Sequence, residues 1–170
     1  MMSIQVTDLC FDEFMTEPSE SSYPGSHSTP DALIRLADEF RDAAKVIEKL
    51  GRPGDPVSRA PFRLNAIHAI ELYLNALLLH AGHESGLVRG LQHDLAIRAD
   101  LASQVGLLLR QRTLAHLHTL ASTREYLLSR YAPEAHRTLS QLNRLSATLD
   151  EVATKVTAIV REDCPKRVSA

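Results

Sequence analysis

The chain has 170 residues, of which 44% are hydrophobic and 5% aromatic, and its formal net charge at pH 7 is −2. This length and apolar fraction suit one globular domain, and the small negative charge argues against a surface built throughout for nucleic-acid binding. The longest uninterrupted apolar run, residues 76–79, is far shorter than the roughly 20 residues that span a bilayer, so we expect no membrane segment.

Two features favour a cytoplasmic location. The two cysteines, Cys10 and Cys164, lie near opposite ends of the chain and form no pair motif, as is typical of a reducing compartment. The first residues also lack the basic region and the continuous apolar stretch of a secretory signal. We therefore expect a cytoplasmic protein.

The N-terminal segment is acidic and rich in turn-forming residues. Residues 1–29 contain no Lys or Arg and carry a formal charge of −5, which leaves +3 for the rest of the chain. Ser and Pro dominate residues 16–29, as in a linker. We interpret residues 1–29 as an acidic arm and linker that packs poorly or docks on the positively charged remainder. Its acidic residues are Asp8, Asp12, Glu13, Glu17 and Glu20.

Five helices are predicted after this arm. Thr29 and Pro30 form a helix-start signal, and apolar residues at three- and four-residue spacing extend the first helix to Gly51. The last helix carries a heptad stripe of apolar residues that we expect to pack within the same chain. Its stripe extends from Leu142 to Ile159, and Cys164-Pro165 ends the helix. The other helices are expected over residues 60–81, 91–109 and 113–131. The helix over residues 60–81 is apolar over much of its circumference, as is typical of a central bundle helix. The predicted fold class is all-α: an antiparallel up-and-down bundle of four to five helices over residues 30–162, with a tail over residues 163–170.

Three short motifs occur in this helical region in a characteristic order. They are Ala66-x4-Glu71-Leu-Tyr-Leu-Asn-Ala-Leu-Leu, then His93-Asp94-Leu95, and then Arg124-x-Tyr126-x3-Arg130-Tyr131-x-Pro133. In order and spacing they resemble the HEPN domain family, whose name refers to higher eukaryotes, prokaryotes and nucleotide binding. The resemblance covers about residues 30–160. Two positions depart from the family pattern, since Asn75 replaces the usual Lys and Ala132 is inserted before Pro133.

The resemblance implies a helical bundle of bacterial HEPN type that frequently forms a homodimer. It implies a binding or interaction module for a nucleotide, an RNA or a partner protein such as a nucleotidyltransferase, with no cofactor. The residues of the matching motifs become the candidate binding residues: Glu71, His93, Asp94, Arg124 and Tyr131. A purely structural dimeric bundle is a further alternative.

Many members of the family are metal-independent ribonucleases with an Arg-x4-6-His motif. His can move a proton near neutral pH and Arg can stabilise phosphate charge. Spacings of this kind link Arg110 to His116, Arg112 to His118 and Arg130 to His136. The candidate catalytic residues are Arg130 and His136, or Arg112 and His118. Because no Asn follows any of these arginines, and Pro133 separates Arg130 from His136, we favour the non-enzymatic module and keep the ribonuclease as the alternative.

The region around Glu71 is also predicted to be a polar cluster. A buried carboxylate needs a partner, so we expect Glu71, His93 and Asp94 to lie together, with Arg130 or Tyr131.

A metal site is the alternative interpretation of this region. The side chains that suit Zn²⁺ as ligands are His80, His83, His93 and Asp94. We favour a capping role for Asp94 and a loop-tying role for His93 over a metal site, and we expect no bound metal.

Overall fold

The computed structural model describes residues 25–134 and 139–162, and every regular element within these ranges is a helix. The all-α class expected from the sequence is therefore confirmed. Most of the acidic arm (residues 1–24) and the C-terminal tail (residues 163–170) lie outside the described residues. The elements are α1 (Pro30–Glu48), the 3-10 turn η1 (Pro56–Arg59), α2 (Ala60–His80), α3 (Ser85–Gly90), α4 (Leu95–Gln104), α5 (Gln111–Ser122), α6 (Glu125–Tyr131) and α7 (Leu142–Glu162).

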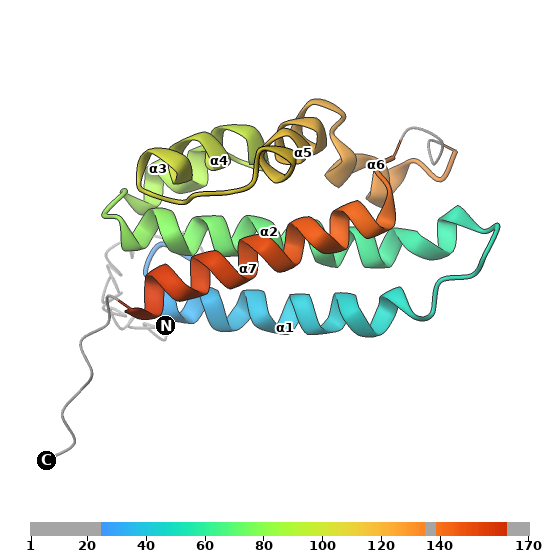
Figure 1. The fold of residues 1–170 in the computed structure, drawn as a ribbon, viewed down its shortest axis with the longest axis horizontal. Helices are drawn as coiled ribbons and strands as arrows, with labels where there is room; N and C mark the ends of the chain where they lie inside the picture. The colour runs from blue at the N-terminus through green and yellow to red at the C-terminus, as the bar shows by residue number, and fades with distance from the viewer. Residues whose placement is uncertain (1–24, 135–138, 163–170) are drawn as a thin grey trace, which may run out of the picture.

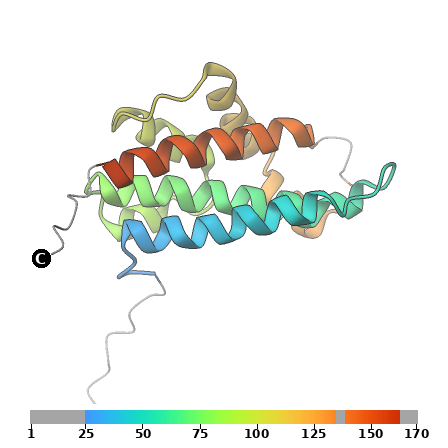
Figure 2. The same ribbon diagram turned by 60° about the horizontal axis from the view of Figure 1, so that its bottom comes forward.

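Three long helices lie side by side, and four short ones pack on them. Figures 1 and 2 show α1, α2 and α7 running along the length of the molecule, with α1 pointing one way and α2 and α7 the other. The short helices α3 to α6 form a second layer that returns from the end of α2 toward the start of α7 (Figure 1). Because α2 packs against α1, α4, α6 and α7, it is the central helix.

The composition of α2 explains its central place. Apolar side chains surround it, and 13 of its residues are buried, so no face is left for solvent along most of its length. The helix nevertheless carries two fully charged residues, Arg63 and Glu71, and both are buried. Each of these charges must therefore find its partner inside the protein.

The outer long helices α1 and α7 are amphipathic and each buries one stripe. Thr29 begins α1 as predicted, with its Oγ1 accepting a hydrogen bond from the Ala32 amide at 3.2 Å. In the heptad stripe of α7, Leu149, Val152 and Val156 are buried in the hydrophobic core. This confirms that the stripe packs within the chain. Among the described residues, none of the helices combines the length and apolar character needed to cross a membrane.

The helix predicted over residues 91–109 is shorter than expected. The Asp94 carboxylate caps α4 by accepting hydrogen bonds from the Ala96 and Ile97 amides at 2.9 and 3.0 Å, so the helix begins at Leu95. Beyond its other end, Gly106 adopts a positive φ of 100°, which a helix cannot continue through. The segment between the helices predicted over residues 60–81 and 91–109 contains the short helix α3.

The helix predicted over residues 113–131 is split into α5 and α6. The break occurs at Arg124, whose φ of 51° lies in the left-handed region. Nothing in the sequence indicated this break, because left-handed turns are normally marked by Gly or Asn and here the residue is an arginine. Tertiary packing therefore overrides the local helical pattern at this point.

Glu151 of α7 holds the N-terminus of α5 in place. It accepts hydrogen bonds from the Arg110 backbone amide at 2.8 Å, from the Thr113 hydroxyl at 2.6 Å and from Lys155 Nζ at 2.7 Å. Partial burial raises the pKa of the Glu151 carboxyl, but the hydrogen bonds from Lys155, Thr113 and the Arg110 backbone outweigh this effect and lower the pKa to about 2.

We expect the substitution Glu151→Gln to lower the free energy of unfolding at neutral pH but not in strong acid. The pKa of about 2 in the folded protein lies below the ordinary value of 4.5, so the ionised carboxylate contributes stability that is fully present above pH 4.5. This stability is lost as the pH falls through about 2. Urea unfolding of both proteins at neutral pH and at several values below pH 4.5 measures the difference. Glu39→Gln, on the exposed side of α1, is the matched control, and a difference that does not change with pH would contradict this assignment.

Candidate functional site

Polar side chains occupy one face of α2 where the helix borders a cleft. His68, Glu71 and Asn75 are spaced three and four residues apart, so they point to the same side of the helix. They line a cleft of about 540 Å³ that is bounded by residues 25–28, α1, α2 and α3. The apolar residues of its wall are Leu33, Leu36, Leu72, Leu79 and Val88.

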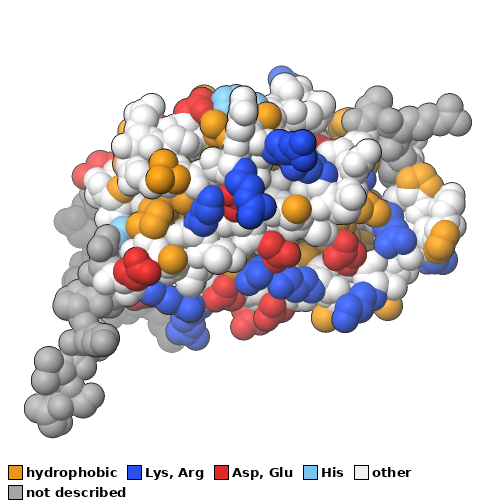
Figure 3. All heavy atoms as spheres, in the orientation of Figure 1, with side chains coloured by type: hydrophobic (Ala, Val, Ile, Leu, Met, Phe, Trp, Pro, Cys, Tyr) orange, Lys and Arg blue, Asp and Glu red, His pale blue; other side chains and the backbone are white. Residues whose placement is uncertain are grey.

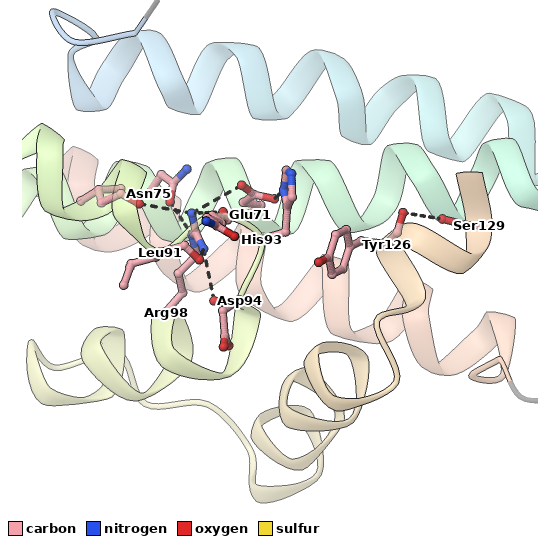
Figure 4. Close-up of polar contacts among 10 residues, drawn as sticks. Glu71, Asn75, Leu91, His93, Asp94, Arg98, Tyr126 and Ser129 are labelled. Carbon is pink, nitrogen blue, oxygen red and sulfur yellow. Dashed lines mark hydrogen bonds and ion pairs between the residues drawn. The ribbon is translucent and has the colours of Figure 1, made fainter. Parts of the chain in front are cut away.

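Arg98 of α4 reaches this cleft from the interior and is the largest of the fully buried side chains. Its Nε donates to Asn75 Oδ1 at 2.7 Å, and its Nη2 donates to Glu71 Oε1 at 3.4 Å (Figure 4). Its remaining hydrogen bonds go to the carbonyls of Val88, Leu91, Gln92 and Asp94. Burial lowers the pKa of Arg98, and Glu71 opposes this change. The guanidinium thus fastens the α3–α4 segment to α2.

Glu71 connects Arg98 to His93. The second carboxylate oxygen, Oε2, lies 3.0 Å from His93 Nδ1. The Glu71 side chain is 12% exposed and the His93 side chain 41% exposed, so the carboxylate has a buried cation on one side and an accessible imidazole on the other. The His93 ring also packs against Tyr126 of α6, with 4.9 Å between the ring centroids. Figure 4 shows His93 and Glu71 pointing toward each other.

His68 brings a buried nitrogen to the cleft wall. Its ring packs edge-on against Phe40 of α1, with a centroid separation of 4.4 Å and an interplanar angle of 89°. Among the described residues no group forms a hydrogen bond with the buried Nδ1 of His68. Burial lowers the pKa of His68, which favours the neutral ring, and a neutral imidazole has one donor and one acceptor nitrogen. His68 thus places a buried ring nitrogen that lacks a hydrogen-bond partner among the described residues behind the cleft wall.

The predicted polar cluster forms, with different partners at its edges. Glu71 and His93 are in contact as expected. The Asp94 carboxylate instead caps α4, and only its backbone carbonyl accepts a hydrogen bond from Arg98, at 3.2 Å. Glu71 pairs with Arg98 rather than with Arg130, and Tyr126 rather than Tyr131 contacts His93. Of the two other expected neighbours, Arg130 is close enough for its charge to assist burial in lowering the pKa of His68, and Tyr131 is 75% exposed.

Arg98 was not among the candidate residues, although a signal for it exists. It lies on the stripe of α4 that also contains Leu95, Ala99 and Ala102, with spacings of three and four residues. An arginine on a buried stripe requires a buried acceptor, and Glu71 is the one acidic residue in α2. His68 was not among the candidate residues either, and its buried Nδ1 has no hydrogen-bond partner among the described residues.

The other two candidate binding residues lie outside the lining of this cleft. Arg124 is exposed at the start of α6, where its backbone carbonyl accepts hydrogen bonds from the Leu127 and Leu128 amides. Tyr131, at the end of α6, is 75% exposed. Arg124 thus contributes its backbone to the α5–α6 turn, and its side chain is free of the cluster around Glu71.

Of the Arg–His pairs proposed for ribonuclease chemistry, Arg112 and His118 are not brought together within one chain. Arg112 and His118 are exposed on α5, and six helical positions rotate their side chains by roughly 240° relative to each other. His118 Nε2 lies 2.9 Å from Asp100 Oδ1 on α4. Arg130 is exposed in the last turn of α6, whereas His136 lies outside the described residues.

The third spacing, Arg110 to His116, also separates its members. Arg110 is exposed before α5, whereas His116 is buried with its Nδ1 2.8 Å from the Thr148 hydroxyl of α7. Within residues 25–134 and 139–162, no three His, Cys, Asp or Glu side chains are grouped so as to hold a metal ion.

A second buried ion pair lies at the opposite end of the helical layer. Arg63 of α2 pairs with Glu125 of α6, and Arg63 Nη2 donates to the Ser140 carbonyl at 2.6 Å. Glu125 Oε2 in turn accepts from the Ser140 amide at 2.9 Å. This network ties the segment before α7 to α2 and α6, so its role is structural.

Comparisons with known proteins give no relative for this chain. No protein-family model matches it, and neither a curated protein nor a solved structure matches it. The assignment of a function therefore depends on the residues and geometry of the chain itself.

Proposed function

We propose that this chain is a HEPN-like helical bundle that acts as a binding module and holds a nucleotide in the cleft beside α2. The observation that carries the proposal is the polar stripe of His68, Glu71 and Asn75 on a helix that is otherwise largely apolar and buried. Burying polar groups is unfavourable unless they find partners. Arg98 uses part of the hydrogen-bonding capacity of Glu71 and Asn75, and the buried Nδ1 of His68 has no partner among the described residues.

The chemistry of the cleft suits a flat heteroaromatic base. Its volume of about 540 Å³ is within the usual range of small-molecule sites, about 300–1,000 Å³. Leucine side chains such as Leu33, Leu36 and Leu72 offer apolar contact to the faces of a ring. Along the ring edge, Glu71 can accept hydrogen bonds from N–H groups and His68 can pair with a ring nitrogen or a carbonyl oxygen. A nucleobase presents this combination of faces and edge groups.

Two structural features support the HEPN-like assignment. The His93-Asp94-Leu95 motif lies at the start of α4, where Asp94 caps the helix and His93 contacts Glu71 of the preceding motif. The long helix α1 is antiparallel to α2, and the short helices return before α7 runs parallel to α2 (Figure 1). This order is compatible with an up-and-down bundle in which the third helix is broken into the short helices α3 to α6.

A substitution that fills the cleft is expected to abolish most of the nucleotide binding. In isothermal titration of the full chain with AMP, GMP, CMP and UMP, we expect at least one nucleotide to bind. Leu36→Arg should weaken that binding at least about tenfold, which corresponds to about 1.4 kcal/mol, because a long charged side chain enters the apolar wall. His68→Phe should weaken binding as well, since it keeps the ring packed on Phe40 but removes the nitrogen.

Val46→Arg is the matched control for Leu36→Arg. Val46 is also an exposed apolar residue of α1, 62% exposed against 45% for Leu36, but it does not line the cleft. Absence of binding for all four nucleotides, or equal weakening by both arginine variants, would contradict the proposal. Cleavage of single-stranded RNA in EDTA that is lost in His118→Ala would instead support the metal-independent ribonuclease.

A further inference from the structure

A basic surface lies where α5 meets α7, apart from the cleft. It consists of Leu108, Arg110, Arg112, Arg144 and Lys155, and we refer to it as the α5–α7 basic surface. These residues are linked to one another, because Lys155 donates to the Leu108 carbonyl and Arg144 donates to the Arg112 carbonyl. Figure 3 shows Lys and Arg side chains gathered on this part of the molecule. The surface is therefore held in place by its own hydrogen bonds.

Most of the positive charge on this surface is not neutralised. Lys155 pairs with Glu151, but no carboxylate within the described ranges lies within ion-pairing distance of Arg110, Arg112 or Arg144. An apolar contact point lies beside these charges, since Leu108 is 81% exposed, the highest value among the large hydrophobic residues described. Charge pairs on a surface are weak by themselves, so a partner also needs apolar side chains that can cover Leu108.

The chain contains a segment with both properties. Residues 1–24 carry five acidic residues and no Lys or Arg, and the apolar residues Leu9, Phe11 and Phe14 are placed among the acids. We propose that residues 1–24 dock on the α5–α7 basic surface of the same chain. Single-stranded nucleic acid is a poorer fit, because the surface contains no aromatic side chain on which a base could stack.

The length of this segment permits the contact within one chain. An extended chain spans roughly 3.3 Å per residue, so 24 residues reach roughly 80 Å from Gly25. The long helix α7, with 21 residues, is only about 31 Å long. A tethered segment also has a high effective concentration near its own surface, which favours docking in the same chain over docking on a second copy.

The position of Cys10 in this segment allows a direct test on the full chain. In a Cys164→Ser variant, a nitroxide label on Cys10 broadens the NMR signals of amides that it approaches. We expect the amide signals of Leu108, Arg110 and Lys155 to lose most of their intensity at low salt. The signals should recover at about 1 M salt, where the Debye length falls to about 3 Å.

A charge reversal separates docking on this surface from other contacts. Arg110→Glu/Arg112→Glu is expected to abolish the broadening and to leave the fold intact, because neither guanidinium has a partner to lose and acidic residues are favourable at the start of α5. Arg35→Glu/Lys49→Glu, on α1 and at its C-terminal cap, changes the net charge equally and should leave the broadening unchanged. The proposal is overturned if the basic surface shows no broadening or if the charge reversal leaves it unchanged. It is also overturned if broadening occurs only between labelled and unlabelled copies in a mixed sample. The outcome is independent of nucleotide binding in the cleft.

Discussion

Arg98→Met should destabilise the protein by about 3–5 kcal/mol, because it leaves the carboxylate of Glu71 buried without its cation. The substitution also removes the hydrogen bonds from Arg98 to Asn75 and to four backbone carbonyls. The free energy of unfolding from urea titration, followed by circular dichroism, measures the effect. Arg35→Met, at an exposed position of α1, should change it by no more than about 0.5 kcal/mol.

The double variant Arg98→Met/Glu71→Gln isolates the ion pair from the other contacts. If the buried charge of Glu71 causes much of the loss, removing that charge as well should restore part of the stability. We expect a coupling free energy of about 1–3 kcal/mol in the double-mutant cycle. The double variant should stay less stable than the parent, since the carbonyls of Val88 and Gln92 lose the hydrogen bonds that Arg98 donates. The carbonyls of Leu91 and Asp94 keep backbone amide donors. Strict additivity of the two substitutions would show that Arg98 and Glu71 are energetically independent.

Glu125→Gln should lower the free energy of unfolding by about 3 kcal/mol, because it leaves the charge of Arg63 unpaired inside the protein. The Glu125 side chain is 1% exposed and the Arg63 side chain 9% exposed. The amide that replaces the carboxylate preserves the size of the residue, so the loss reports on charge rather than on packing. Equilibrium unfolding in urea at neutral pH provides the measurement.

An exposed ion pair offers a matched comparison for this effect. Asp150 pairs with Arg41 at 2.8 Å, but its side chain is 52% exposed. Asp150→Asn also replaces a carboxylate by an amide, and we expect it to change stability by less than about 1 kcal/mol, since solvent screens the charge that remains. Equal losses for Glu125→Gln and Asp150→Asn would show that burial does not determine the strength of the Arg63–Glu125 pair.

Local patterns were sufficient to predict the all-α class and several helix features. The start of α1 at Thr29 and Pro30, the buried stripe of α7 and the apolar character of α2 depend on neighbours three or four residues away. The contact between Glu71 and His93 was also expected, since a carboxylate on an apolar helix requires a partner. These features are determined by short-range periodicity and by the unfavourable burial of an unpaired charge.

The helix breaks in the second layer were not predictable in the same way. Arg124 adopts a left-handed conformation with no Gly, Asn or Pro to indicate it, so a helical pattern continuous in sequence becomes two helices. The capping role expected for Asp94 is confirmed, since its carboxylate accepts hydrogen bonds from the Ala96 and Ile97 amides, but the helix was expected to begin at residue 91 rather than at Leu95. At Arg124 the conformation follows from what the segment packs against, whereas the start of α4 follows from the local Asp94 cap.

The sequence by itself determined that this protein is helical, that α2 lies at its centre and that the charge of Glu71 is paired inside it. Only the tertiary structure decided which cation that is, because Arg98 is 27 residues from Glu71 in the chain and several other arginines were equally available. The same holds for Arg63 and Glu125, which are 62 residues apart, and for the cleft that borders His68. The physical reason is that periodicity specifies which face of a helix is buried, whereas the packing of one helix on another selects the partner on that face.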